Sequence, residues 1–468
     1  MNKVISSLRE ATTLSGLRDG MTVSFHHHLR SGDYVLNMVM AEIAAMGLKN
    51  ITINASSLHD GHAPLTEHIR SGVVTGIETS YIGAKIGQTI SAGALQTPVI
   101  FQTHGGRASA LRRGTSHVDV AFIAAPTADG MGNCTGKLGK SACGALGYAF
   151  SDAQYADKVI VITDHLVPYP LTCRSISEVW VDYVVEVDSI GDPAGIVSGT
   201  TRLPRDPVSL MIADMAAAAI AASGYLKEGF SFQTGAGGAS LATAASLHKI
   251  IKRQGIRGSY AYGGVTGYLV DMLNDRCFQS IQDVQCFDLQ AVESLRSDPR
   301  HVEISAVEYA DPFAKSCGAS NLDIAVLGAT EIDLDFNVNV HTDSYGRIMG
   351  GSGGHSDVAE SAKLTVIVAP LHRTRIPTIL DRVTCISTPG TSVDLFVSQA
   401  GAAVNPRRPQ MKERLLAAGV PLAGMGALKS RVEALTGVPQ PLPRGERIVA
   451  EVLTRRGEPL DRIYQTLT

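Results

Sequence analysis

Apolar residues of this chain occur in short, nearly unbroken runs that polar and glycine-rich segments separate. The clearest runs lie at 50–54, 98–102, 118–125, 158–163, 322–329 and 364–370. A strand that is buried on both faces reads as a continuous apolar run, so these segments are typical of parallel strands covered by helices. Helical stretches and glycine-rich turns lie between them, as crossover connections require. The pattern therefore predicts an α/β fold with mostly parallel sheets.

The chain also contains an internal repeat. Residues 117–135 ("HVDVAFIAAPTADGMGNCT") align with residues 321–339 ("NLDIAVLGATEIDLDFNVN") without a gap. This alignment superposes three pairs of polar residues: Asp119 with Asp323, Asp129 with Asp333, and Asn133 with Asn337. Two further pairs of segments match in the same order: 19–53 with 228–261, and 148–163 with 353–368. Internal repeats of this kind indicate a duplication, and we expect two tandem related domains.

The expected domain boundary follows the alanine-rich helix that ends near residue 224. We therefore assign residues 1–224 to the first domain and residues 225–468 to the second. The segment from about 405 to 468 is basic and is expected to be a helical appendage. Residues 191–207 are rich in glycine and proline and are expected to form an ordered connection.

Composition and charge narrow the class of protein. With 18% charged and 44% apolar residues, the chain is expected to be well packed, and its net charge of −3 offers no basic surface for nucleic acid or an anionic membrane. Its seven cysteines form no CxxC pair and no signal peptide is visible, so a cytoplasmic protein with reduced thiols is expected. The most apolar stretch, 208–226, carries Asp214 and is interpreted as a buried helix and not a membrane span.

Three consecutive histidines, His26, His27 and His28, follow the first expected strand of the repeat. Their position inside the chain excludes a purification tag. On an extended strand His26 and His28 share a face, so a metal site would need another ligand such as His59 or His62. The residues alone leave three interpretations: a metal site, histidines satisfied at a strand end, or a substrate-binding loop. We favour the loop and expect no metal, because ligands bind at the carboxyl ends of parallel strands.

Two glycine-rich loops also end expected strands. Four of the five residues 350–354 are glycine, so the N–H groups of Gly351, Gly353 and Gly354 can approach an anion or a developing oxyanion. The alternative is a merely flexible loop. The second loop, 234–240, precedes a helix but is not a dinucleotide fingerprint, since Ser240 replaces the third glycine and no acidic residue ends the next strand.

Several segments resemble the CoA-transferase superfamily and, within it, the α subunits of citrate lyase. The resemblance extends over nearly the whole chain. It is most specific in five segments: 79–106, "GDPAGIVSGTTRLPRDP" (191–207), 263–289, "GATEIDLDFNVNV" (328–340) and "MGGSGGHSDVAESAKLTVIV" (349–368). The resemblance implies two tandem CoA-transferase-like domains.

It also implies an activity and partners. A family member would be a citrate CoA-transferase that exchanges acetate for citrate on an acyl-carrier protein. It would work with a β (lyase) subunit and a γ (carrier) subunit, and would form a homo-oligomer. It would hold no tightly bound cofactor, because the CoA-like phosphoribosyl-dephospho-CoA arm belongs to the carrier; a free CoA thioester is the other donor. Two alternatives stay open: transfer or hydrolysis with another acid such as citramalate, and a non-catalytic effector-binding protein.

The resemblance places functional residues as well. Related CoA-transferases use a glutamate nucleophile at a position that falls on 262–264, where this chain has no carboxylate. This departure implies transfer through a mixed anhydride, with Glu331 as the remaining rival nucleophile. The expected citrate-binding residues are His26, His27, His28, Arg30 and Arg107, with Arg112 and Arg113 as further candidates. The expected contacts of the CoA-like arm are Gly235, Gly237, Gly238, Gly263, Gly264 and His355.

Overall fold

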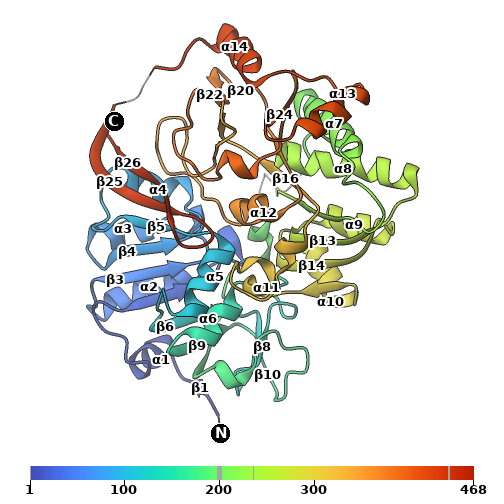
Figure 1. Ribbon diagram of the computed structural model, residues 1–468. Coiled ribbons are helices and arrows are strands. Elements are labelled where there is room, and N and C mark those ends of the chain that lie inside the picture. Colours follow the sequence, from blue (N-terminus) through green and yellow to red (C-terminus); the bar gives the residue numbers. More distant parts are fainter. Residues whose placement is uncertain (1, 198–202, 236, 441–442, 468) are drawn as a thin grey trace.

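The computed structural model describes residues 2–197, 203–235, 237–440 and 443–467. Its core consists of two large sheets, each covered by helices; Figure 1 shows the first in blue to teal, with a C-terminal hairpin in red, and the second in green to orange. Residues 198–202 of the expected connection at 191–207 lie outside the described residues. Every pairing within the two sheets is parallel except two hairpins, so the predicted α/β fold with mostly parallel sheets is confirmed.

The first sheet has ten strands. Their spatial order is β1 (Val4–Ile5), β11 (Tyr183–Glu186), β9 (Lys158–Thr163), β6 (Val120–Ala124), β2 (Thr22–Phe25), β3 (Ile51–Ala55), β4 (Val74–Thr79), β5 (Val99–Phe101), β25 (Arg444–Leu453) and β26 (Pro459–Thr466). A small sheet lies beside it: β10 (Leu166–Val167), β7 (Thr127–Asp129) and β8 (Cys134–Thr135).

The second sheet repeats this topology with eight strands. Their order is β15 (His301–Glu303), β14 (Phe278–Cys286), β13 (Gly258–Val265), β12 (Ser231–Thr234), β16 (Ile324–Gly328), β19 (Leu364–Val368), β23 (Leu395–Ser398) and β24 (Gly401–Val404). Its smaller companions are β18 (Val338–Asn339), β17 (Glu331–Asp333) and β22 (Ile379–Leu380), and the pair β20 (His372–Arg373) and β21 (Ile376–Pro377). From β15 to β23, each strand occupies the place of its counterpart between β5 and β11.

The polar residues matched by the sequence repeat make equivalent hydrogen bonds. The side-chain amide of Asn133 donates to Asp129 at 2.8 Å, and that of Asn337 donates to Asp333 at 3.1 Å. Each aspartate thereby closes the turn that leads out of a short strand, because it also accepts backbone N–H groups of that turn. The repeat is therefore structural as well as sequential.

Helices connect the strands and cover both sheets. They are α1 (Leu8–Leu14), α2 (Val35–Ala45), α3 (Leu65–Arg70), α4 (Ala84–Ser91), α5 (His104–Arg113), α6 (Ala149–Tyr155), α7 (Pro207–Ala222), α8 (Gly238–Gln254), α9 (Gly267–Asn274), α10 (Leu289–Ser297), α11 (Ala306–Ala310), α12 (His355–Ser361), α13 (Pro409–Ala417) and α14 (Met425–Thr436). Helix α5 shows how the local sequence sets the ends of a helix. Thr103 caps its first turn, and Gly114, with φ +70°, ends it. Helices α5 and α6 pack against α11 and α12 between the two sheets (Figure 1). Among the described helices, none is long and apolar enough to cross a membrane.

The C-terminal segment differs from the prediction. Helices α13 and α14 form its first half, but residues 444–466 form the hairpin of β25 and β26, drawn in red in Figure 1. Strand β25 pairs in parallel with β5, so this hairpin extends the sheet of the first domain. The expectation of a helical appendage on the second domain is therefore wrong for these residues. Pairing with an open sheet edge satisfies backbone groups that a local pattern does not reveal.

Candidate functional site

The histidine run lies between the two domains. His26, His27 and His28 directly follow β2, and all three side chains are buried. His59 and His104, from the ends of other strands of the first sheet, complete a group that we call the histidine cluster (His26, His27, His28, His59 and His104). The ring of His27 lies 5.5 Å from those of His59 and His104, between ring centroids.

Contacts with both domains hold the cluster. The backbone N–H of Ala124 donates to Nε2 of His26 at 2.9 Å, and the ring of His27 lies on that of Tyr148 at a centroid distance of 4.8 Å. From the second domain, Nε2 of Gln285 donates to the carbonyl oxygen of His27 at 2.8 Å. The arrangement therefore needs both domains.

Burial keeps the cluster uncharged. It lowers the pKa of His26 to about 4 and that of His104 to about 3, and it lowers those of the other three well below 6.5. Nε2 of His59 and Nδ1 of His104 are buried without a hydrogen-bond partner in the described part of the chain. Buried polar atoms are nearly always paired in proteins, so these two nitrogens are available to a bound molecule.

Arg30 contributes a cation beside the neutral imidazoles. It begins a short 3-10 helix, Arg30–Gly32, with φ +51°, and its guanidinium lies 4.9 Å from the ring centroid of Phe287. Within the described residues its one side-chain hydrogen bond is long, 3.5 Å to the carbonyl oxygen of Ile196, and burial lowers its pKa. Among the described residues, no carboxylate lies within 4 Å of it. A mostly buried guanidinium without a counter-ion favours an anionic ligand.

The glycine-rich loop of the second domain, residues 350–354, contacts the histidine cluster. The carbonyl oxygen of Gly353 accepts a hydrogen bond from the N–H of His104 at 2.9 Å. A Cβ atom at Gly351 would lie 2.1 Å from the carbonyl oxygen of Ser80, and one at Gly354 would lie 2.1 Å from the hydroxyl of Tyr309. Only glycine fits these contacts, so the loop is a packed part of the domain interface and not a free flexible segment.

Two aspartates that correspond in the repeat fix α5, one of them across the domain interface. Asp357, in α12, accepts hydrogen bonds from Thr103 and from the N–H of Gly105, at the start of α5. Its counterpart in the repeat, Asp152, accepts a 2.7 Å hydrogen bond from Arg107 within the first domain. Burial raises the pKa of Asp357 to about 6.

Three predicted site residues, Arg107, His355 and Glu331, already have hydrogen-bond partners within the protein. Arg107 is 3% exposed and pairs with Asp152 and Asn54, so its guanidinium is used within the first domain and is not a free citrate ligand. Both ring nitrogens of His355 are engaged, by Thr388 and by the carbonyl oxygen of Gly328, at 2.8 Å each. This does not fit a contact with the CoA-like arm.

Glu331, the rival nucleophile, is fully buried in β17. Its carboxylate accepts hydrogen bonds from the side chain of Asn339 and from the N–H and hydroxyl of Thr384. A carboxylate saturated in this way is a structural acceptor and not an exposed nucleophile.

The glycines expected to contact the arm lie on the second domain. Gly235 and Gly237 lie between β12 and the 17-residue helix α8, and Gly238 is the first residue of that helix; Ala236 is outside the described residues. Gly263 and Gly264 lie in β13 at an irregularity of its pairing with β14. No carboxylate stands at residues 262–264, as the sequence indicates. The contacts of these glycines with an arm stay a prediction.

Sequence reasoning missed two members of the site, His104 and Tyr148. The loop that contains His104 ends an expected strand, which was a usable signal, whereas nothing in the local sequence distinguishes Tyr148. A cavity of about 570 Å³ lies between the C-terminal hairpin and α14, and no residue of the histidine cluster lines it. The chemistry of the buried side chains, and not cavity size, therefore identifies this site.

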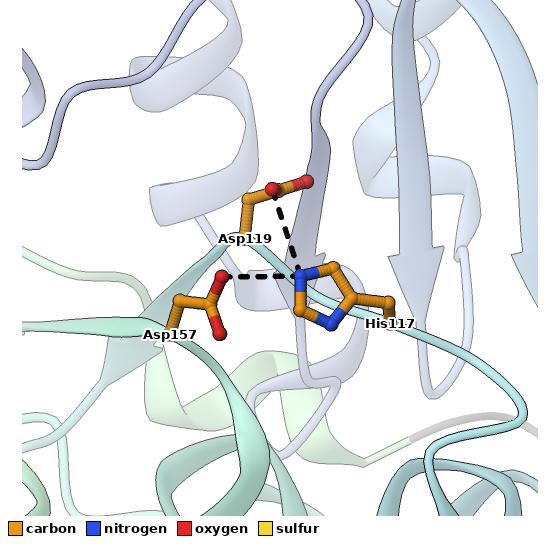
Figure 2. Close-up of side chains that lie close together, drawn as sticks. All are labelled: His117, Asp119 and Asp157. Atoms are coloured by element: carbon orange, nitrogen blue, oxygen red, sulfur yellow. Dashed lines mark hydrogen bonds and ion pairs between the residues drawn. The ribbon is translucent and has the colours of Figure 1, made fainter.

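A different group has the composition of a metal site. Among the described residues, only His117, Asp119 and Asp157 place three ligand atoms within 4.8 Å of one another (Figure 2). His117 and Asp157 are more than half exposed, and Asp119 also accepts the N–H of Thr22. Asp323, the counterpart of Asp119, likewise accepts an N–H, that of Ser231, and pairs with Lys363. The repeat therefore favours a surface ion pair at His117 over a metal site.

Known proteins match this sequence over nearly its whole length. The chain matches the family model described as citrate lyase, alpha subunit (CitF), over residues 1–466. It is 48% identical over 463 residues to the citrate lyase alpha chain of Escherichia coli K12, and the match covers 99% of this chain and 91% of that protein. The citrate lyase alpha chain of Klebsiella pneumoniae is 47% identical, with the same coverage of both chains.

Two solved structures have a similar fold. The alpha subunit of citrate lyase from Streptococcus mutans, in complex with citrate, superposes with a TM-score of 0.98 at 48% identity, covering 100% of this chain and 92% of that chain. The alpha subunit of malonate decarboxylase from Acinetobacter baumannii has a TM-score of 0.68 at 17% identity, covering 93% and 88%, and shares the fold.

Proposed function

Because the chain belongs to the family of citrate lyase α subunits, we propose that it exchanges acetate for citrate on an acyl-carrier protein. Acetyl-carrier and citrate become citryl-carrier and acetate. The observation that carries this proposal is Arg30, a mostly buried cation with no carboxylate within 4 Å in the described part of the chain. A citrate carboxylate is the counter-ion that its fork of donors suits.

The neutral histidines complete the citrate site. Nε2 of His59 and Nδ1 of His104 have no partner among the residues that the structure describes, and neutral imidazoles can donate to a carboxylate or accept from the citrate hydroxyl. The relative from Streptococcus mutans, at 48% identity, was solved with citrate, which supports the same ligand here. Arg107 is absent from this set because Asp152 already binds it.

The reaction proceeds in two acyl transfers without an enzyme adduct. A citrate carboxylate oxygen attacks the acetyl thioester carbonyl, and the C–S bond breaks to give a mixed anhydride and the carrier thiolate. The thiolate then attacks the citryl carbonyl of the anhydride, and acetate leaves. The protein positions two anionic reactants and stabilises each oxyanion, which oriented N–H groups of residues 350–354 can do. In the described residues, the N–H groups of Gly351, Ser352 and Gly354 have no acceptor.

Partners follow from the same assignment. A citrate lyase α subunit works beside a β subunit, which cleaves the citryl thioester, and a γ subunit, which carries the acyl group. The thioester arm then belongs to the γ subunit, and this chain needs no tightly bound cofactor of its own. We further propose that the chain assembles as a homo-oligomer.

An exchange assay tests the proposal. The purified chain is incubated with acetyl-carrier and labelled citrate, and the label on the carrier is measured. Transfer of label with release of acetate is expected. Citramalate and acetyl-CoA, offered in place of citrate and acetyl-carrier, separate a citrate-specific carrier transferase from a CoA-transferase of broader range. Citrate binding without transfer to either thioester would contradict the enzymatic assignment.

A further inference from the structure

A second, smaller cavity lies away from the histidine cluster. It measures about 140 Å³ and is enclosed by the end of β5, one side of α5, the turn of the C-terminal hairpin and Phe313 of the second domain. Helix α5 connects it to the site, since His104 begins the helix and Arg113 ends it. At 1.5 Å per residue the two are about 14 Å apart along the axis.

Of the described residues that line this cavity, three are arginines and none is acidic. Arg113 lies over the ring of Phe313 at 3.8 Å, and no carboxylate is within 4 Å of it among the described residues. Arg455 and Arg456 each have a carboxylate only at 3.9 Å, Asp357 and Glu360 respectively, which is beyond hydrogen-bonding distance. The lining is therefore strongly cationic.

Unpaired polar atoms point to the same place. The hydroxyl of Ser109 and Nε of Arg455 have no hydrogen-bond partner within the described chain, although these side chains are only 2% and 5% exposed. The side-chain oxygen of Gln102, which also lines the cavity, is likewise unpaired. Both Nη atoms of Arg455 already donate, to the hydroxyl of Ser361 and the carbonyl oxygen of Ala310, so Nε is its remaining donor. Native proteins rarely leave such atoms without a partner, so a bound group that accepts hydrogen bonds accounts for the hydroxyl of Ser109 and Nε of Arg455.

We propose that this cavity binds a phosphate-type oxyanion, held by Arg113, Arg455 and the hydroxyl of Ser109. Arginine suits phosphate because several of its N–H groups can bond to two oxygens at once. The phosphate has two possible sources: a free small anion, or a phosphate group of the carrier's CoA-like arm. The second source depends on the proposed function, whereas binding of the anion itself does not.

Titration of the full chain with inorganic phosphate tests the site. Calorimetry at constant ionic strength, with chloride replacing phosphate in the blank, gives the dissociation constant. We expect saturable binding, and Arg113→Gln should raise the dissociation constant at least tenfold. Ser109→Ala should raise it severalfold. Arg296→Gln removes an arginine charge that is likewise exposed, on α10 and outside the lining, and should change the dissociation constant less than twofold.

Two results would overturn the site: no saturable phosphate binding by the unmodified chain, or equal affinities in the unmodified chain and Arg113→Gln. Circular dichroism and melting temperature show that the variants are folded. Exchange kinetics then identify the source. If phosphate raises the KM for acetyl-carrier in the unmodified chain but not in Arg113→Gln, the site holds the arm; if it binds without changing that KM, the site holds a free anion. The titration involves no thioester, so its outcome is independent of the exchange activity.

Discussion

Gln285 of the second domain donates a 2.8 Å hydrogen bond to the backbone carbonyl of His27 in the first. Gln285 is itself held, since its N–H donates to Asp283 at 2.8 Å. The loop that carries the histidines therefore takes its position partly from the other domain. This makes Gln285 a positioning residue, because it reaches the site only through His27.

Replacing Gln285 with Met should lower kcat/KM for citrate about threefold to tenfold. The apolar side chain has a similar length but removes one of the two donors to the carbonyl of His27, at a cost of about 0.5–1.5 kcal/mol, and leaves the N–H of Arg30 at 3.0 Å as the other. Steady-state exchange assays measure the change, and Gln290→Met, on the exposed side of α10, is the control. Gln285→Glu tests the role further, since it keeps the shape and removes the donor. Normal kinetics in both Gln285 variants would assign the bond to stability alone.

Replacing Arg30 with Ala should raise the KM for citrate at least tenfold. The scale is that of one lost hydrogen bond to a charged group, about 1.5–3 kcal/mol. The KM for acetyl-carrier should change much less, which separates loss of citrate binding from general damage. Arg30→Lys keeps the charge but not the fork of donors, so an intermediate KM is expected. Arg9→Ala, an exposed arginine paired with Glu42, is the control. Equal losses for both substrates would contradict a specific role in citrate binding.

Replacing Gly353 with Val should reduce exchange far more than stability. Gly353 has φ +51°, and an added Cβ would lie 3.2 Å from Nε2 of His104. The variant thus strains the backbone by about 1–3 kcal/mol and displaces a histidine of the site. Gly419→Val imposes comparable strain, at φ +72°, where an added Cβ meets nothing within 4 Å. Exchange rates and melting temperatures of the two variants are compared. A large fall in melting temperature with near-normal exchange by Gly353→Val would show that the loop is only structural.

Stability should fall as the pH falls from about 6.5 to about 4. The pKa of His26 is about 4 in the folded chain and 6.5 in the unfolded chain, so in this window the unfolded state binds the proton more readily. Each such histidine lowers the free energy of unfolding by up to about 1.4 kcal/mol per pH unit of acidification. Asp357 acts in the opposite sense, because its folded pKa is about 6, and burial also raises the pKa of Asp152 and of Asp394, but these are three groups against the five of the histidine cluster.

Urea unfolding midpoints at pH 7.5, 6.0 and 5.0 measure this dependence. His26→Asn should flatten the slope between pH 6.5 and 4. A midpoint that stays constant or rises on acidification would mean that the histidine cluster is not buried in its neutral form.

Glu331 should form no thioester adduct. Its carboxylate already accepts hydrogen bonds from Asn339 and Thr384, so Glu331→Gln should lower stability by about 1–3 kcal/mol and leave exchange per folded molecule within about threefold. Hydroxylamine treatment of the chain after incubation with acetyl-carrier, followed by peptide mass spectrometry, checks for modification. A hydroxamate at Glu331, or at any other glutamate, would overturn the mixed-anhydride route.

Local pattern determined the strands, the repeat and part of the site. Apolar runs indicate buried parallel strands because burial on both faces leaves no polar position, and β6, β9 and β19 lie within the runs that predicted them. The pairs Asp129–Asn133 and Asp333–Asn337 were visible because each closes its turn within five residues. The histidine run could be placed at a strand end for the same reason, since strand and loop are adjacent in the chain.

Contacts between distant segments decided the rest. Residues 444–466 became strands because the edge of β5 offered unpaired backbone groups about 350 residues earlier in the chain. Arg30 and Arg107 look alike in sequence, but Asp152 and Asn54 surround Arg107 in the folded protein, whereas Arg30 faces no carboxylate among the described residues. The charge that a side chain meets after folding depends on partners that no local pattern records. Only the tertiary structure therefore shows that Arg107 belongs to a buried ion pair and that Arg30, among the described residues, does not.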